Sequence, residues 1–115
     1  MALQRTRLAN IQYIPSTAGS IYTNSINTKT HIKGFVFFNN NTVTETVKIY
    51  NVPDNAGAVG TAGSANQFLE IGIPAKDTVF IEIPYVIMLI DENDSIQGSS
   101  TNASMVTVQV LGDKE

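Results

Sequence analysis

Residues 30–38 of the chain, THIKGFVFF, alternate between two sets of side chains. One set consists of Ile32, Val36 and Phe38 with Gly34 between them, and the other consists of His31, Lys33, Phe35 and Phe37. A period of two is typical of a β-strand, whose successive side chains point to opposite faces of the sheet. The stretch therefore predicts a strand with its aliphatic set facing a core and its other set, including Phe35 and Phe37, on the opposite face.

Four further segments alternate in the same way along the rest of the chain. They are residues 45–51 (ETVKIYN), 68–73 (FLEIGI), 79–83 (VFIEI) and 106–110 (VTVQV). Segments rich in Asn, Asp, Gly and Pro separate the strands, and residues of these types favour turns. Dense β-branched residues argue against helices. The pattern predicts an all-β fold, an antiparallel, jelly-roll-like β-sandwich of seven to eight short strands.

Composition excludes several classes of function. Charged residues make up 15% of the 115 residues, against about 25% in an average soluble domain, and the net charge is −3. This balance offers no basic surface for nucleic acid. The longest apolar run, residues 86–90 (VIMLI), is far too short to span a membrane. The chain has no Cys, which excludes disulfides and thiolate chemistry.

The first residues are less periodic than the rest. We expect residues 1–18 to form an N-terminal arm and residues 19–115 to form a single sandwich domain. The arm has Arg5 and Arg7, which we expect to meet an acidic surface, and the apolar side chains of Ile11 and Tyr13. We expect the part from Leu3 to Ile14 to reach a neighbouring subunit, with a disordered tail as the alternative.

The inventory of catalytic and metal-binding groups is thin. His31 is the one His, it lies within a predicted strand, and no Ser stands at a motif-like spacing from it. Asp91, Glu92 and Asp94 are the best local candidates for a Ca²⁺ or Mg²⁺ site, although the spacing lacks the Gly and the closing Glu of an EF-hand. A solvated acidic turn is the simpler interpretation. The sequence predicts no enzyme and calls for no cofactor.

Aromatic residues indicate an interaction surface. Five of them lie opposite the most aliphatic stripes: Phe35, Phe37, Tyr50, Phe68 and Phe80. Because one face of each sheet in a sandwich is core, these side chains predict a second apolar face that a partner covers. The alternative is that a face has been misassigned, or that both faces of one sheet are covered within the monomer.

Five segments, in this order, resemble a family of small virion-associated proteins of tailed bacteriophages. They are residues 32–39 (IKGFVFFN), 46–53 (TVKIYNVP), 63–69 (GSANQFL), 92–98 (ENDSIQG) and 106–112 (VTVQVLG). The fourth is the most specific, and it departs from the family's pattern at Asn93, where Gly is usual. That departure bears on the geometry of the turn.

The resemblance implies a non-enzymatic protein of the virion, assembled in the host cytoplasm as a symmetric homo-oligomer, with a trimer favoured. We expect a capsid decoration protein that binds the major capsid protein. The neck, the tail or a fibre base is the alternative location. A carbohydrate-binding module for host adhesion is the alternative from another class, since sandwiches often bind sugars. A hydrolytic enzyme would require His31 to be catalytic.

Overall fold

A computed structural model describes the backbone of residues 4–115 and the side chains of residues 8–115 except that of residue 85. Eight strands follow one another along the chain: β1 (Gln4–Tyr13), β2 (Gly19–Thr23), β3 (Thr30–Asn39), β4 (Glu45–Val52), β5 (Gln67–Ile73), β6 (Thr78–Leu89), β7 (Ser95–Ser100) and β8 (Val106–Lys114). A single 3₁₀ turn, η1 (Ser64–Asn66), precedes β5. No helix in this described part is long and apolar enough to cross a membrane.

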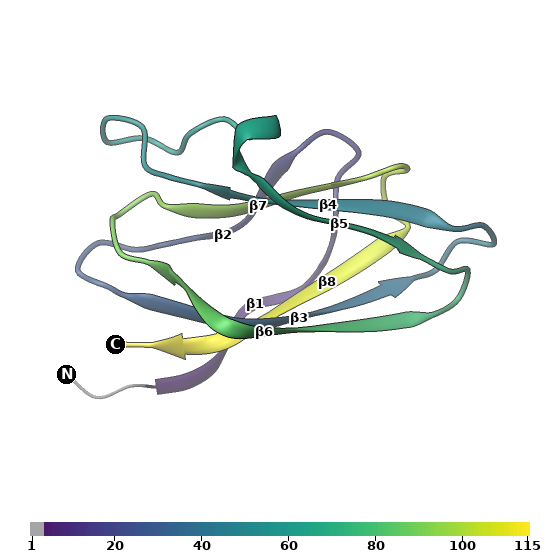
Figure 1. Cartoon of the computed structure of the whole chain (residues 1–115), viewed down its shortest axis with the longest axis horizontal. Helices are drawn as coiled ribbons and strands as arrows, with labels where there is room; N and C mark the ends of the chain where they lie inside the picture. Colours follow the sequence, from purple (N-terminus) through teal and green to yellow (C-terminus); the bar gives the residue numbers. More distant parts are fainter. Residues whose placement is uncertain (1–3) are drawn as a thin grey trace.

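The strands form two four-stranded antiparallel sheets that pack face to face (Figure 1). The first sheet has the order β1-β8-β3-β6 and the second has the order β2-β7-β4-β5. Each sheet pairs strands from opposite ends of the chain, so that β1 lies beside β8 and β2 lies beside β7. This is the winding of a jelly roll, and it confirms the predicted all-β sandwich.

The core lies between the two sheets and consists of the inward side chains of both. Its fully buried members come from alternate positions, as in Val47 and Ile49 on β4 and Val106, Val108 and Val110 on β8. Burial of these apolar surfaces is the main stabilising term of such a fold.

A β-bulge in β3 reverses the facing of its side chains. Ile32 is paired with Gly112 and Gly34 with Leu111, so one extra residue, Lys33, is inserted in β3. Beyond a one-residue insertion every side chain moves to the other face. Thr30 and Ile32 point inward before the bulge, and Phe35 and Phe37 point inward after it, with both phenyl rings fully buried.

The predicted facing of residues 34–38 is therefore wrong. Phe35 and Phe37 belong to the core, where their rings stack with centroids 5.9 Å apart. Val36 and Phe38 are on the outer face instead. Uninterrupted alternation is a reasonable assumption for nine residues, and only the pairing with β8 reveals the inserted residue.

The N-terminal segment also differs from the expected arm. Residues 4–13 form β1, which pairs with β8 from Gln4 opposite Lys114 to Tyr13 opposite Thr107. Leu8 and Ile14 are buried in the core, and the Ile14 backbone N–H donates to the Val106 carbonyl at 2.8 Å. The boundary expected at residue 18 thus does not divide an arm from the sandwich, because β1 supplies an edge of the first sheet.

Asn residues shape the turns. Asn39 is buried, its side-chain amide donates to the carbonyls of Val43 and Ile73 at 2.9 Å each, and its Oδ1 accepts from the Asn41 N–H at 2.8 Å. Asn93 has a φ of +76°, in the left-handed region that Gly and Asn tolerate best. Asn93 therefore takes the backbone conformation that a Gly would take at this turn.

Candidate docking groove

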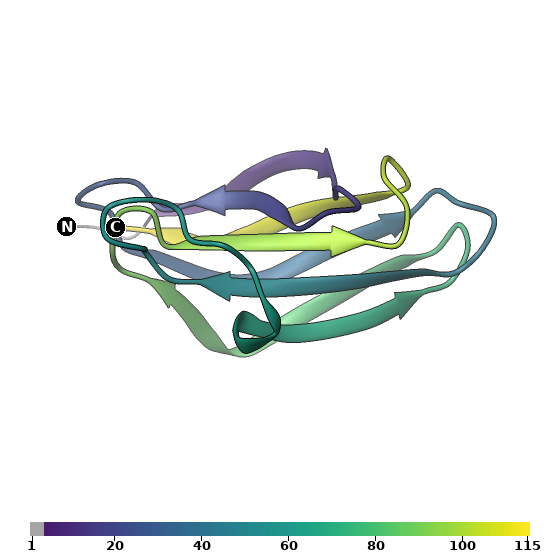
Figure 2. The same cartoon turned by 90° about the horizontal axis from the view of Figure 1, so that it is seen from above.

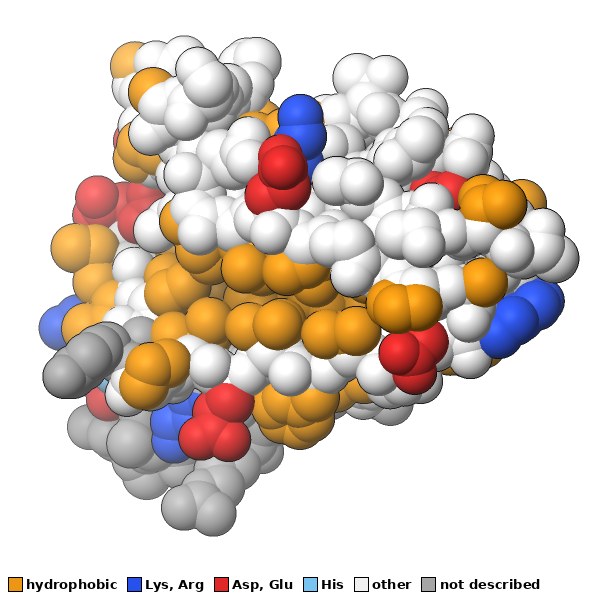
Figure 3. Space-filling model, turned by 45° about the vertical axis from the view of Figure 1, so that its right-hand side comes forward, with side chains coloured by type: hydrophobic (Ala, Val, Ile, Leu, Met, Phe, Trp, Pro, Cys, Tyr) orange, Lys and Arg blue, Asp and Glu red, His pale blue; other side chains and the backbone are white. Residues whose placement is uncertain are grey.

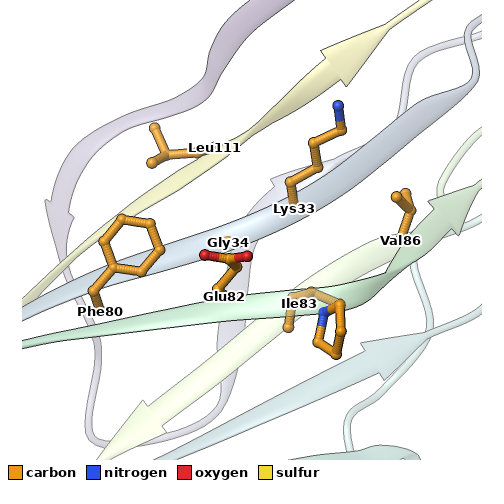
Figure 4. A pocket seen from close by; sticks show the side chains of 8 residues that line it. Lys33, Gly34, Phe80, Glu82, Ile83, Val86 and Leu111 are labelled. Carbon is orange, nitrogen blue, oxygen red and sulfur yellow. The ribbon is translucent and has the colours of Figure 1, made fainter.

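A groove crosses the outer face of the first sheet, where β3, β6 and β8 lie side by side (Figure 4). Its volume is about 410 Å³. Lys33, Gly34, Phe80, Glu82, Ile83, Pro84, Val86 and Leu111 line it. Most of these groups are apolar, and Lys33 and Glu82 supply one charge of each sign.

Local irregularity in two neighbouring strands creates the groove. Between the pairs Ile32–Ile87 and Gly34–Glu82, two steps along β3 correspond to five steps along β6. The extra residues of β6 include Pro84, which has no N–H to donate and is tolerated because β6 is an edge strand. Bulges at coinciding positions are features that reshape a sheet surface for contact with other groups.

Phe80 forms one wall of the groove and covers Gly34. A Cβ added to Gly34 would lie 3.3 Å from the Phe80 ring and 3.1 Å from the Ile81 carbonyl oxygen, so the ring occupies the space that a side chain would take. Phe80 is nevertheless 59% exposed. Val86 on the opposite wall is 40% exposed, and Met88 and Phe38 extend the exposed apolar surface along the same face.

The charge of Lys33 is held at the side of the groove. Its Nζ lies 2.5 Å from Oδ2 of Asp113, and the Asp113 side chain is almost fully buried. Because this ion pair has one buried partner, the position of Lys33 is better defined than that of a fully exposed lysine. The groove thus combines apolar walls with the ammonium group of Lys33, which is paired with Asp113 and still half exposed, and such a surface suits a protein segment with apolar and polar side chains.

The expected interface residues separate into three groups. Ile11, Tyr13, Phe68 and Phe80 are exposed, which is compatible with an interface. Phe35 and Phe37 are core residues, and Tyr50 is buried on the outer face of the second sheet, so the continuous aromatic face expected from the sequence does not form. The side chains of Arg5 and Arg7 lie outside the described residues.

The acidic turn, residues 91–94, uses the Asp94 carboxylate to accept hydrogen bonds from backbone N–H groups. Oδ1 of Asp94 accepts from the Asp54 N–H at 2.8 Å, and Oδ2 accepts from the N–H groups of Ile90 and Asp91 at 3.1 and 3.0 Å. Asp91 and Glu92 point to solvent. No group of three or more acidic or His side chains in the described residues is arranged to hold a metal ion.

His31 lies on β3, where it is paired with Asp113 of β8. Its Nε2 is buried and lies 3.8 Å from Oε2 of Glu115, without a hydrogen-bond partner. No interaction in the described residues joins its ring to a Ser or Thr hydroxyl, so the geometry gives no activated nucleophile.

Glu45 is a buried carboxylate that the alternating sequence pattern does not single out. It accepts from the Asn102 N–H at 2.8 Å, from the Asn102 side-chain amide at 2.6 Å and from the Asn41 side-chain amide at 2.9 Å. Burial by itself raises the pKa of a carboxyl, but these hydrogen bonds outweigh it, and the pKa of Glu45 lies below the ordinary 4.5. The residue ties the β3–β4 turn to the β7–β8 turn; its position at the start of an alternating strand is the only signal in the sequence.

A second, smaller cleft lies on the outer face of the second sheet. Its volume is about 340 Å³, and it is lined mainly by hydroxyl-bearing side chains: Ser16, Thr46, Tyr50, Ser99, Ser100 and Thr101, together with Lys48. Unlike the groove on the first sheet, this cleft is polar.

Comparisons with known proteins bear on the fold. No protein-family profile matches the sequence, and no curated protein matches it. Among solved structures, the chain is similar to one from Bacillus endospore appendages, described as a novel family of disulfide-linked pili. The alignment covers 97% of this chain and 86% of the other, with a TM-score of 0.53 and 14% sequence identity. Such a likeness shows a shared sandwich fold, and a disulfide linkage has no counterpart in a chain without Cys.

Proposed function

We propose that this protein is a non-enzymatic structural component of a tailed-bacteriophage particle, and that it decorates the capsid as a symmetric oligomer. The observation that carries the proposal is the groove over the paired bulges, whose exposed Phe80 and Val86 flank the positioned Lys33. The five sequence segments that resemble virion-associated proteins are the reason for proposing that the protein acts on the phage particle.

The proposed mechanism is geometric. The sandwich holds the groove rigid, because both bulged strands are paired with neighbours in the first sheet. An apolar segment of the major capsid protein fills the groove, and its carboxylate meets Lys33. Many such contacts, repeated by the symmetry of the shell, give tight binding from weak individual sites. A neck, tail or fibre-base protein would use the same contact at another location.

The test is reconstitution on particles that lack the protein. We expect the purified wild-type chain to bind such particles, and Val86→Asp to abolish binding because it places a carboxylate in the apolar wall. Val59→Asp is the matched control, since Val59 is 41% exposed in the long loop after β4. This loop contacts β7 of the second sheet, where the Gln97 side-chain amide donates to the Gly60 carbonyl at 2.9 Å, whereas the groove lies on the first sheet. No binding by the wild-type chain, or equal binding by the two variants, would overturn the proposal.

The hydroxyl-lined cleft favours one alternative, a carbohydrate-binding module for host adhesion. Hydroxyl groups and a Tyr are suitable partners for sugar hydroxyls. A glycan array probed with the protein, with and without Ca²⁺, tests this alternative. Signal that is lost in Lys48→Ala and retained in Val86→Asp would favour it over decoration, and absence of signal would remove it.

A further inference from the structure

The two sides of the sandwich are closed to different extents. On one side β1 and β2 are linked across the sheets by the Gln12 side-chain amide, which donates to the Ile21 carbonyl at 3.2 Å. The other side lies between the edge strands β5 and β6 (Figure 2). There the side chains that pack against the core stay partly exposed: Leu69, Ile71, Val79, Ile81, Ile83 and Ile87. Ile83 lies next to Pro84 at the bulge of β6 and also borders the groove. We call these six residues the β5–β6 seam.

The seam forms a continuous apolar band along the molecule. Figure 3 shows this band of hydrophobic side chains running lengthwise between the edges of the two sheets. All of its members are aliphatic, and five of the six are β-branched. Monomers rarely leave a contiguous apolar surface of this kind in contact with water. Among residues 4–115, both flanking strands also have one edge of backbone N–H and C=O groups without a neighbouring strand, and such edges pair readily with another chain.

We propose that the seam is where a second copy of this chain docks, related by a two-fold axis parallel to the strands. Such an axis brings β5 of one copy beside β6 of the other, and it does so twice. The short turn at residues 74–77 makes β5 and β6 run in opposite directions, so the new neighbours are antiparallel. The two seams then form one shared core, and each sheet continues into a sheet of the partner.

The face is large enough for the interface of a stable dimer. The molecule measures 44 × 28 × 21 Å, and the seam side is the broad face seen along the shortest axis in Figure 1. The rectangle spanned by the two longer extents has an area of about 1,200 Å², compared with the roughly 800 Å² of accessible surface that each partner of a specific complex buries. A contact over about two thirds of this rectangle would reach that size.

Few charges lie beside the seam. The register that places Ile71 opposite Ile81 of the second copy also places Glu70 opposite Glu82 of that copy on the outer surface, where a Lys side chain lies near each carboxylate. Glu70 on the outward side of β5 has Lys48 Nζ 3.9 Å from its Oε1. Glu82 on the outward side of β6 lines the groove that also holds Lys33. The inward positions carry no charge at all. Interface cores are depleted in charged residues in the same way.

The inference deepens the proposed function by naming the surface of self-association, and it is tested in solution without particles. In sedimentation equilibrium we expect the wild-type chain at twice its 12.4-kDa mass, dissociating on dilution. Ile71→Lys and Ile81→Glu should each shift the equilibrium to the monomer by at least a factor of 100 in Kd. Ile26→Lys, at a 66% exposed position in the β2–β3 turn, is the matched control and should stay dimeric.

Two further measurements keep the test decisive. Mixing Ile71→Lys with Ile81→Glu should restore dimers, because β5 of one copy faces β6 of the other and the two charges meet. In the wild-type chain, amide exchange in β5 and β6 should slow as protein concentration rises, while that in β1 and β2 should not. A monomeric or trimeric wild type, or seam variants as dimeric as Ile26→Lys, would overturn the inference, whereas failure of the proposed function would appear only in particle binding.

Discussion

Replacing Phe37 and Phe38 one at a time by Ala tests the β-bulge of β3 directly. The two residues are adjacent and chemically identical, but Phe37 is fully buried and Phe38 is 36% exposed on the outer face. Uninterrupted alternation from Ile32 would place Phe38 in the core and Phe37 outside. The structure therefore predicts an order of effects opposite to that of the simple pattern.

The expected magnitudes follow from burial. Removing a fully buried phenyl ring costs about 3–5 kcal/mol, because the transfer free energy is lost and a cavity is left. Phe38 loses only the contacts of a partly covered surface ring, worth about 1 kcal/mol. With an unfolding entropy of about 2.1 cal/mol/K per residue, 115 residues convert these values to a fall in Tm of about 12–20 °C for Phe37→Ala and about 4 °C for Phe38→Ala.

The assay is urea unfolding followed by circular dichroism, at one protein concentration for all variants because self-association would add to stability. Phe37→Leu and Phe38→Leu serve if Phe37→Ala does not fold, with expected losses of about 1–2 kcal/mol and nearly none. Equal effects, or a larger effect at Phe38, would refute the bulge and the assignment of the aromatic rings to the core.

Three other outcomes are expected. Glu45→Gln should lower the free energy of unfolding by about 2 kcal/mol at neutral pH, since charge-assisted hydrogen bonds are lost. Because the pKa of Glu45 in the folded protein lies below 4.5, the stability that its carboxylate contributes is present above pH 4.5 and is lost as the pH falls further. The free energies of unfolding of the wild type and Glu45→Gln, measured by urea titration, should therefore converge in acid. A difference that stays constant with pH would contradict the assignment. Gly112→Ala should lower the free energy of unfolding by at least about 2 kcal/mol, because the added Cβ would overlap the His31 carbonyl oxygen. Gly63→Ala should leave it nearly unchanged in the same titration, because the space around Gly63 is open. Millimolar Ca²⁺ should leave the Tm unchanged, because the Asp94 carboxylate is occupied by three backbone N–H groups, and a rise in Tm with Ca²⁺ would show that the acidic turn binds metal.

The alternating strands were predictable because they need only local information. In β4 and β8 the inward valines and isoleucines are those that alternation selects. The Asn-rich turn at residues 39–41 was equally readable from its residue types, since Asn39 supplies the hydrogen bonds of the turn itself. For β3 the pattern predicted a strand correctly and its facing incorrectly, because a single inserted residue is invisible without the partner strand.

The candidate sites were less predictable. Phe80 was recognised as an exposed aromatic, but Val86 and Leu111 join it only because β3, β6 and β8 are neighbours in space. Glu45 and Asn102 are more than fifty residues apart in the sequence, and no sequence pattern predicts that they are in contact. The seam residues of β5 and β6 look like ordinary core residues in the sequence, since alternation cannot distinguish a central strand from an edge strand.

The sequence by itself determined the class of fold, through a period-two pattern that only a half-buried sheet satisfies, and it excluded disulfides through the absence of Cys. The tertiary structure decided which strands lie at the edges, where the bulges fall and which apolar side chains remain uncovered. The physical reason is that facing in a strand depends on local geometry, whereas exposure depends on neighbours brought from distant parts of the chain. Both proposed contacts of this protein depend on this pairing of strands: the groove lies across β8, β3 and β6, and the seam lies between the edge strands β5 and β6.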